Sequence, residues 1–159
     1  MHANSPTLKP VVTRLGTKNQ AEISSHFLRL DSTARRSRFG NCVNDGFIDE
    51  YAERIFNLDG VVYGVFIAGE LRAIAELREI LDNWPTTTEA AFSVEPKWQD
   101  KGLGNLLVDH IASVARTLGT KSINMICLRD NARMKHLALK QKRLMEFARC
   151  GVELKLEYC

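Results

Sequence analysis

The sequence predicts a single mixed α/β (α+β) domain in which helices pack on a sheet. Three observations indicate this fold class. Strand-like and helix-like segments alternate along the chain, residues 103–118 carry the clearest amphipathic helix, and residues 152–158 alternate apolar and polar side chains like a half-buried strand. A chain of 159 residues is also long enough to bury one core. The predicted order of elements is β-α-α-β-β-β-α-β-α-β-β.

The chain begins with a polar, proline-containing stretch that predicts a flexible tail over residues 1–10. The remaining residues, 11–159, are treated as one domain, since they contain no repeat, linker or low-complexity tract. Within this domain, β-branched and aromatic runs predict strands, whereas apolar residues at steps of three and four predict helices. We expect strands at 11–15, 61–67, 71–77, 89–94, 122–128 and 152–158, a loop at 82–88, and helices at 20–30, 47–56, 103–118 and from 131 onward. The predicted order includes one further strand, between the last helix and residues 152–158, to which no bounds are assigned.

Local signals mark the ends of several elements. Gly69 supplies the positive φ that a tight hairpin turn needs, and Gly119 stands where a left-handed cap ends the longest helix. Asn131 can cap the helix that follows it. Asp31, together with Ser32, either ends the first helix or caps the segment after it.

Composition argues against several classes of protein. The chain is 45% hydrophobic and 26% charged, as ordinary globular domains are. A net charge of +3 suits an anionic ligand but does not indicate nucleic acid, because the densest basic group, Arg35, Arg36 and Arg38, is typical of a solvated surface. No apolar run approaches the ~20 residues that span a bilayer, so no membrane association is expected.

The four cysteines lack the paired spacing of a metal site, and no secretion signal accompanies them. We therefore expect reduced thiols, a cytoplasmic location and no bound metal. The cysteines are Cys42, Cys127, Cys150 and Cys159.

The most informative segment is residues 94–104, where a predicted strand turns into the longest helix. Gly102 and Gly104 remove side chains at that turn. The first-turn N–H groups of a helix have no intrahelical partner and lie at the positive end of its dipole, so such a turn can hold a pyrophosphate. Lys97 and Lys101 flank the turn and can meet phosphate charge. The alternative is that two glycines simply open a helix, and their spacing alone does not decide.

In its context, this segment resembles the GNAT superfamily of N-acetyltransferases. Gln99-Asp100-Lys101-Gly102-Leu103-Gly104 matches the superfamily motif Gln/Arg-x-x-Gly-x-Gly/Ala, and the order of elements matches over residues 88–141. Further stretches are similar to the acetyltransferase domain of bacterial protein-lysine acetyltransferases: Ser37-Arg38-Phe39, Glu89-Ala90-Ala91-Phe92-Ser93-Val94, Trp98-Gln99 and Asn131-Ala132-Arg133-Met134. The resemblance implies a mixed, mostly antiparallel central sheet flanked by helices.

The resemblance also implies acetyl-CoA as co-substrate. The backbone amides of the glycine turn would bind the pyrophosphate, the end of the preceding strand would hold the pantetheine arm, and Asn131 would lie beside that arm. The implied cofactor-binding residues are Phe92, Ser93, Val94, Gln99, Asp100, Lys101, Gly102, Leu103, Gly104, Asn105, Asn131 and Met134.

Glu89 matches a strand carboxylate that resembles the general base of the lysine-acetylating group. A lysine-type amine has a pKa of about 10.4 and must lose a proton, directly or through a water, before it attacks a thioester. Glu76 is the reserve candidate, and the alternative for Glu89 is a carboxylate that only ends a strand at the surface. Many family members have a tyrosine general acid where this chain has Ala138, so the general acid is left open. His136, on a basic helix, is expected to be solvated.

Together these features predict an N-acetyltransferase that moves an acetyl or other acyl group to a primary amine by direct attack. The acceptor, a small-molecule amine or a protein lysine, is left open, and so are the acyl length and a homodimer formed by sheet edges. A non-catalytic acyl-CoA sensor of the same fold is the alternative that Ala138 favours. An unrelated nucleotide-binding domain would share only the glycine turn.

Overall fold

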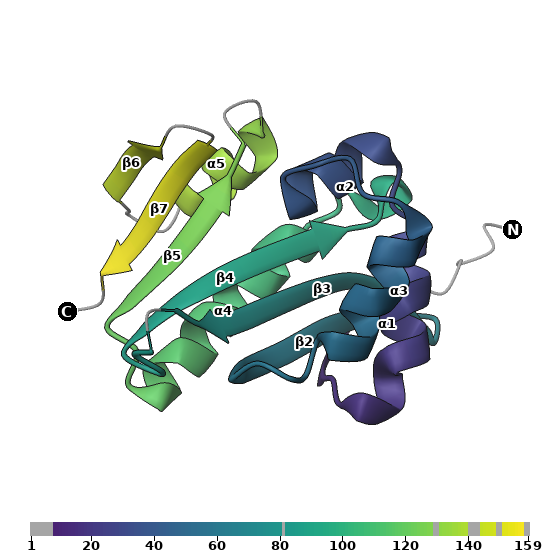
Figure 1. Cartoon of the computed structure of the whole chain (residues 1–159), viewed down its shortest axis with the longest axis horizontal. Coiled ribbons are helices and arrows are strands. Elements are labelled where there is room, and N and C mark those ends of the chain that lie inside the picture. Colours follow the sequence, from purple (N-terminus) through teal and green to yellow (C-terminus); the bar gives the residue numbers. More distant parts are fainter. Residues whose placement is uncertain (1–7, 81, 129–130, 140–143, 149–150, 158–159) are drawn as a thin grey trace, which may run out of the picture.

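The computed structural model describes residues 8–80, 82–128, 131–139, 144–148 and 151–157 (Figure 1). Side chains are described within these ranges except for residues 126, 127, 138 and 139 and those of the last two strands. Most of the predicted tail, residues 1–7, lies outside the described residues. Residues 8–10 lead into the first strand without regular structure.

The described strands form one seven-stranded sheet in the order β1-β2-β3-β4-β5-β7-β6. Every neighbouring pair is antiparallel except β4 and β5, which are parallel. The prediction of a mixed, mostly antiparallel sheet flanked by helices is therefore confirmed. The strands are β1 (Val11–Arg14), β2 (Gly60–Ile67), β3 (Glu70–Glu79), β4 (Thr87–Val94), β5 (Ser122–Cys127), β6 (Leu144–Ala148) and β7 (Gly151–Glu157).

Helices cover both faces of this sheet. α1 and α3 pack on one face, and α4 packs on the other, against β2, β3 and β4 (Figure 1). Short 3-10 turns precede α1 and α4. The helical elements are η1 (Thr17–Asn19), α1 (Gln20–Leu28), α2 (Ser32–Phe39), α3 (Asp45–Arg54), η2 (Pro96–Trp98), α4 (Leu103–Leu118) and α5 (Ala132–Leu139).

The local signals in the sequence act as expected. Gly69 has φ +80° in the hairpin turn, and Gly119 has φ +75° at the end of α4. Asp31 Oδ1 accepts a hydrogen bond from the Ala34 amide at 2.8 Å and so caps the helix after it. Asn131 Oδ1 likewise accepts from the Met134 amide at 3.2 Å and caps α5. Each of these signals lies within a few residues of the backbone that it shapes.

Two features differ from the sequence prediction. α2 is an additional helix that the sequence did not predict. It carries three arginines and no fully buried residue, so it lacks the apolar periodicity that indicated the other helices. β4 begins at Thr87, so the predicted loop 82–88 ends earlier than expected. The reason is parallel pairing: Thr87 lies opposite Ser122 and Thr88 opposite Ile123, a contact that the local sequence does not encode.

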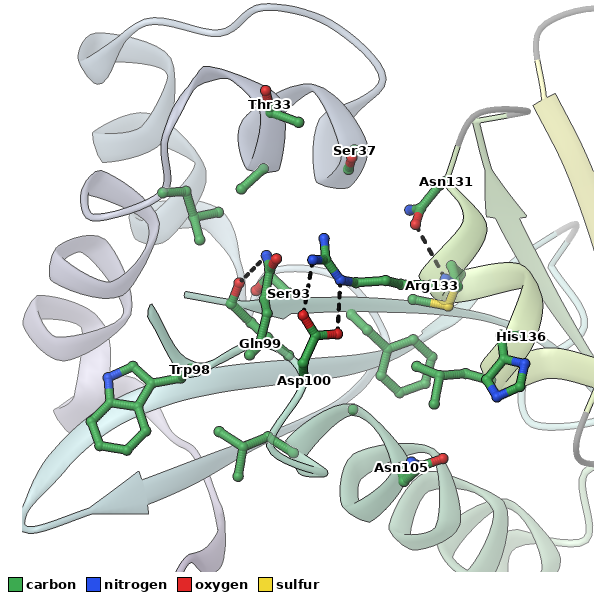
Figure 2. A pocket seen from close by; sticks show the side chains of 18 of the residues that line it. Thr33, Ser37, Ser93, Trp98, Gln99, Asp100, Asn105, Asn131, Arg133 and His136 are labelled. Carbon is green, nitrogen blue, oxygen red and sulfur yellow. Dashed lines mark hydrogen bonds and ion pairs between the residues drawn. The ribbon is translucent and has the colours of Figure 1, made fainter. Parts of the chain in front are cut away.

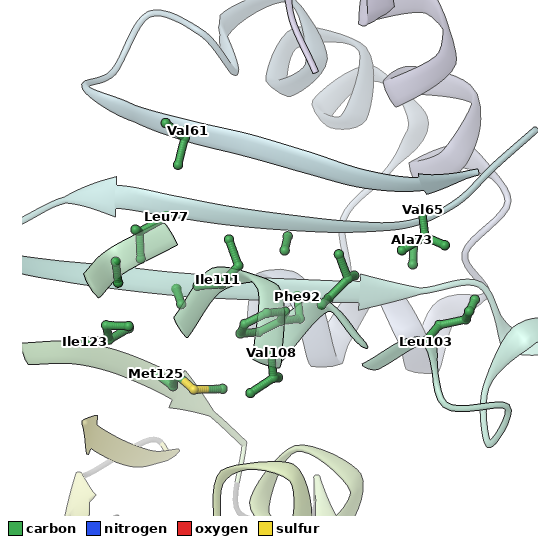
Figure 3. Close-up of a cluster of buried hydrophobic side chains, with 14 of the residues drawn as sticks. Val61, Val65, Ala73, Leu77, Phe92, Leu103, Val108, Ile111, Ile123 and Met125 are labelled. Carbon is green, nitrogen blue, oxygen red and sulfur yellow. The ribbon is translucent and has the colours of Figure 1, made fainter. Parts of the chain in front are cut away.

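Apolar side chains fill both faces of the central strands. On one face, Val108 and Ile111 of α4 pack on Leu77, Phe92 and other strand residues (Figure 3). On the other face a second cluster joins α1 and α3 to β2 and β3, and includes Ile23, Phe27, Ile48, Val62 and Ile74. Because full burial of such a side chain contributes about 1.5–3 kcal/mol, these clusters hold the sheet and helices in fixed positions.

β4 and β5 separate at one end of the sheet. Their parallel pairing runs from Thr87 opposite Ser122 to Ala90 opposite Met125, whereas β4 continues to Val94. Figure 1 shows the two strands diverging beyond that point. The end of β4 thus pairs with β3 on one side, while its other backbone edge faces the gap left by β5.

The first residue of β2 has little room for a side chain. A Cβ on Gly60 would lie 2.3 Å from the Leu77 carbonyl oxygen, and its φ is +153°. We expect Gly60→Ala to lower the free energy of unfolding by about 2–4 kcal/mol, because backbone cannot yield as a side chain does. Urea unfolding measures this change. Gly16→Ala is the matched control, since no atom lies within 4 Å of its added Cβ; equal losses in the two variants would contradict the explanation.

Candidate active site

A cavity of about 430 Å³ opens beside the end of β4 (Figure 2). Small-molecule sites commonly have volumes of this order. Its walls come from the end of β4, the turn into α4, the first turns of α5, and α2 with the segment that precedes it. Figure 2 shows Thr33 and Ser37 on the α2 side, Asn105 on α4, and Asn131 and His136 on the α5 side.

The turn into α4 presents backbone donors to this cavity. Gly102 takes a left-handed conformation, with φ +84°, at the helix N-cap. The first helical hydrogen bond runs from the Leu106 amide to the Gly102 carbonyl, so the amides of Leu103, Gly104 and Asn105 precede it and lack an intrahelical acceptor. These residues line the cavity. The geometry therefore suits an anion at the start of α4.

The two glycines of the turn have different structural roles. No atom lies within 4 Å of a Cβ built on Gly102, so its left-handed backbone is what favours glycine there. A Cβ on Gly104 would instead lie 2.9 Å from Leu137 Cδ1. Gly104 thus allows α4 and α5 to approach closely, which brings the two helix N-termini to the same cavity.

The loop before this turn is held by a buried carboxylate, Glu95. Arg29 Nε donates to it at 2.7 Å and Arg72 Nη1 at 3.0 Å, while His26 Nδ1 lies 3.3 Å away. Burial alone would raise the pKa of the Glu95 carboxyl, but the hydrogen bonds from His26 and Arg29 outweigh it and hold that pKa below its usual range. Glu95 therefore stays ionised and ties the loop to α1 and β3.

His26 links this carboxylate to the cavity wall. Its ring is fully buried, and its Nε2 lies 2.8 Å from the hydroxyl of Ser93, which lines the cavity. Burial lowers the pKa of His26 in spite of the opposing effect of Glu95, so the ring is neutral at pH 7. Because Glu95 can only accept, Nδ1 carries the proton and Nε2 accepts from Ser93.

A second carboxylate, Glu76, is buried on the side of the sheet covered by α1–α3. It accepts hydrogen bonds from Arg38, Arg78 and the Tyr51 hydroxyl. Burial would raise the pKa of Glu76, but the charges of Arg38 and Arg78 outweigh it and lower that pKa. A fully buried carboxylate held in this way is a poor proton acceptor, which argues against Glu76 as the general base.

A smaller cavity of about 40 Å³ lies where β4 and β5 separate. It shares Ser37, Phe92, Asn131 and Met134 with the main cavity and adds residues such as Arg38 and Ala91. The shared residues show that the small cavity continues the large one toward the centre of the sheet.

Glu89 lies on β4, half-buried, opposite Arg78 of β3 and beside Asn124 of β5. It is not among the described residues that line either cavity. The two residues that follow it, Ala90 and Ala91, line the small cavity, and strand alternation places the Glu89 side chain on the same face as Ala91, about 7 Å away along the strand. Its role as a general base stays a prediction.

The structure brings most of the implied cofactor-binding residues together. All of them line the main cavity except Lys101, whose ammonium lies 4.9 Å from the centroid of the Trp98 ring. Lys97 is exposed and also lies outside the lining. The binding roles themselves stay predictions.

Ala138 lies on α5, but its side chain is outside the described residues, and so are those of Cys127, Cys150 and Cys159. Cys42 is a free, exposed thiol.

Sequence reasoning missed several residues of the cavity. Leu30, Asp31 and Thr33 contribute because α2 folds over the end of β4. His136, which the sequence assigned to solvent, is exposed but does line the cavity. Arg133 lies within a stretch that supported the resemblance, yet nothing local gave it a role. Its partner, Asp100, is 33 residues away in sequence.

Metal-binding groups and membrane-spanning helices are both absent from the described part of the chain. No group of three or more His, Cys, Asp or Glu side chains there is arranged to hold a metal ion. Among the same residues, no helix has the length and apolar character needed to cross a membrane.

Comparison with known proteins places this geometry in context. The model of the acetyltransferase (GNAT) family matches residues 28–142. Among solved structures, the GNAT domain of S. lividans PAT is similar, with a TM-score of 0.80 and 19% identity, covering 99% of this chain and 100% of that one. The PaiA N-acetyltransferase of Thermoplasma acidophilum, in complex with coenzyme A, has a TM-score of 0.72 and 14% identity, covering 95% and 100%.

A third similar structure is the spermidine N-acetyltransferase of Vibrio cholerae, in complex with CoA and spermine. Its TM-score is 0.69 with 18% identity, and the match covers 92% of each chain. A search of curated proteins finds no match. At these identities the structural likenesses show a shared fold.

The buried His26 makes stability depend on pH. Its folded-state pKa lies below the ordinary value of 6.5, so below pH 6.5 the unfolded chain binds a proton that the folded chain does not. The free energy of unfolding should therefore fall as the pH drops below 6.5, with a slope of up to about 1.4 kcal/mol per pH unit.

Urea unfolding between pH 7.5 and 5.5 measures this slope. His26→Gln keeps a donor and an acceptor but cannot titrate, so its slope should be smaller. His136→Gln, at an exposed position, should keep the native slope. A His26→Gln protein with an undiminished slope would show that His26 is not the titrating group.

Proposed function

The chain belongs to the acetyltransferase (GNAT) family, and on that premise we propose that it is an N-acetyltransferase acting on a primary amine with acetyl-CoA as co-substrate. The observation that carries the proposal is the cavity, which extends from the donor-rich turn at α4 to the point where β4 and β5 separate. It combines an anion site with an extended backbone edge. The similar PaiA and spermidine N-acetyltransferase structures are complexes with coenzyme A.

In this proposal each part of the coenzyme meets a different part of the cavity. The amides of Leu103, Gly104 and Asn105 bind the pyrophosphate at the start of α4. The free edge of β4 near Phe92 and Val94 donates to and accepts from the amides of the pantetheine arm, as a neighbouring strand would. The acyl group then lies at the small cavity.

Transfer requires a neutral amine. Its nitrogen attacks the thioester carbonyl, a C–N bond forms, the C–S bond breaks, and the released thiolate takes up a proton. Glu89 is the proposed base. Because Glu89 precedes the lining residues Ala90 and Ala91 and does not itself line the small cavity, a bridging water is the better route for the proton. Glu76 is a weaker candidate, since Arg38 and Arg78 hold it as a low-pKa carboxylate.

The acceptor is proposed to be a small-molecule amine or a protein lysine. Of the similar proteins, one is described as a spermidine N-acetyltransferase, and another is the GNAT domain of PAT. The alternative function, a sensor that binds acyl-CoA without turning it over, is favoured by Ala138 at the position where many members have a tyrosine. Turnover separates the two functions, because a sensor binds acetyl-CoA but releases no coenzyme A with any amine.

The role of the turn is tested by two glycines of the same helix. Gly102 and Gly119 lie at opposite ends of α4 with φ +84° and +75°, and no atom lies within 4 Å of either added Cβ. Each alanine variant should lose a similar stability, about 1–2 kcal/mol. Only Gly102→Ala disturbs the cavity amides, so it alone should weaken acetyl-CoA binding, by about tenfold. Isothermal titration calorimetry measures the affinity; parallel weakening in both variants would rule out the turn as the binding element.

The role of Glu89 is tested by coenzyme A release from acetyl-CoA across a panel of amines and lysine peptides. Removal of a general base typically costs 10²–10⁴ in rate, so Glu89→Gln should lower kcat by about 10² or more while acetyl-CoA affinity is kept. Glu50→Gln on α3, outside both cavities, is the control. Native activity in Glu89→Gln across pH 6 to 9 would show that Glu89 is not the base.

A further inference from the structure

An ion pair spans the mouth of the main cavity. Arg133 of α5 donates from Nε to Asp100 Oδ1 at 3.1 Å and from Nη2 to Asp100 Oδ2 at 3.0 Å. Both residues line the cavity, and Figure 2 shows the two hydrogen bonds joining the glycine turn to α5. The pair therefore lies next to the backbone amides that the proposed function assigns to the pyrophosphate.

The charges around the cavity are unfavourable for such a ligand. Among the described residues that line it, Arg133 is the one permanently charged cation, whereas Asp31 and Asp100 are carboxylates. Lys101, in the same turn, is directed to the Trp98 ring and is not part of the lining. With Arg133 neutralised by Asp100, the polar attraction left for a diphosphate comes mainly from backbone dipoles.

The pair opens at little cost. The Asp100 side chain is 72% exposed and that of Arg133 is 62% exposed. Exposed ion pairs contribute little to stability because water and salt screen them. An arginine also binds a phosphate in the same two-pronged way as a carboxylate. A phosphate that enters the mouth can therefore replace Asp100 as the partner of Arg133.

We propose that Asp100 and Arg133 set the affinity of the enzyme for its coenzyme. Without ligand, Arg133 is held on Asp100; when the diphosphate binds, Arg133 turns to a phosphate oxygen and Asp100 remains beside it as a like charge. Arg133 thus strengthens binding of the phosphate-bearing ligand, and Asp100 weakens it. Since acyl-CoA and released coenzyme A share these phosphates, Asp100 promotes product release. This inference rests on the proposed function.

The competing explanation is a purely structural contact that fastens the turn to α5. The two explanations predict opposite effects of removing the carboxylate. If Asp100 only orders the turn, Asp100→Asn disorders the anion site and weakens coenzyme binding. If it competes for Arg133, the same change tightens binding. Asparagine suits the test because it tolerates the left-handed backbone of Asp100, which has φ +59°.

The experiment measures Kd by isothermal titration calorimetry for two ligands, coenzyme A and pantetheine, which lacks the phosphates. Asp100→Asn and Arg133→Gln are compared with a matched pair of controls, Glu50→Gln and Arg54→Gln. Glu50 and Arg54 form an ion pair on α3 with exposures of 68% and 67%, and neither lines a cavity. Each control changes the net charge as its test variant does. Arg133→Lys keeps the charge but loses the two-pronged geometry.

We expect Asp100→Asn to bind coenzyme A about three- to tenfold more tightly, because the change removes one negative charge beside the bound phosphates and salt screens that charge only in part. Arg133→Gln should bind it about tenfold more weakly, with Arg133→Lys in between. Pantetheine affinity should change less than twofold in every variant, and the controls should match the native protein. Added salt should reduce the difference between Asp100→Asn and the native protein.

Unchanged or weaker coenzyme A binding by Asp100→Asn would overturn the inference, and so would equal shifts for pantetheine. A native protein that binds no coenzyme A would instead refute the proposed function. The two failures are therefore distinguishable within one set of titrations.

Discussion

The cavity depends first on the carboxylate of Glu95. Divergence of β5 leaves the end of β4 paired on one side only, so the last residues of β4 need another anchor. The Glu95 amide donates to the Arg72 carbonyl at 3.1 Å, and its side chain accepts from Arg29 and Arg72. These contacts fix the direction in which the loop leaves β4. They therefore also fix the positions of the glycine turn and of the N-terminus of α4, which follow that loop.

Glu76 is a second buried carboxylate that anchors a wall of the cavity, since it holds α2 against the sheet. α2 lacks an apolar stripe, so hydrophobic burial alone cannot hold it against the sheet. Arg38 of α2 instead anchors the helix, because its side chain extends to Glu76 of β3 and donates a hydrogen bond to it. Its guanidinium also lies 4.7 Å from the centroid of the Phe39 ring and 5.4 Å from that of the Tyr51 ring. Breaking such a buried pair from one side typically costs 3–5 kcal/mol. The polar network therefore keeps in place the helix that forms one wall of the cavity.

The sequence predicted those parts of the molecule that are encoded locally. The periodicity of α4, the caps at Asp31 and Asn131 and the turn glycines each depend on residues within one or two helical turns, and all were found where expected. The resemblance similarly identified a contiguous motif whose residues, except Lys101, line one cavity.

Pairings between distant residues could not be predicted in this way. The Arg38–Glu76 contact joins residues 38 apart and Asp100–Arg133 joins residues 33 apart, and no local pattern distinguishes these arginines from solvated ones. The start of β4 at Thr87 likewise depends on pairing with β5. The general acid could not be predicted either. Ala138 shows that the tyrosine of the family pattern is absent, but the sequence does not identify the group that protonates the thiolate in its place.

Binding and chemistry are carried by different elements in the proposed enzyme. In that proposal the glycine turn and α5 would contact parts of the coenzyme that do not react. They would then stabilise substrate, transition state and product alike, and such uniform binding lowers KM without raising kcat. Glu89, on β4, would act only when the amine loses its proton. Released coenzyme A would keep every phosphate contact that acetyl-CoA makes. Weaker phosphate contacts therefore speed the dissociation of the product and so favour turnover. Asp100, a carboxylate beside the proposed phosphate site, would supply that weakening without any change to the residues of the reaction itself.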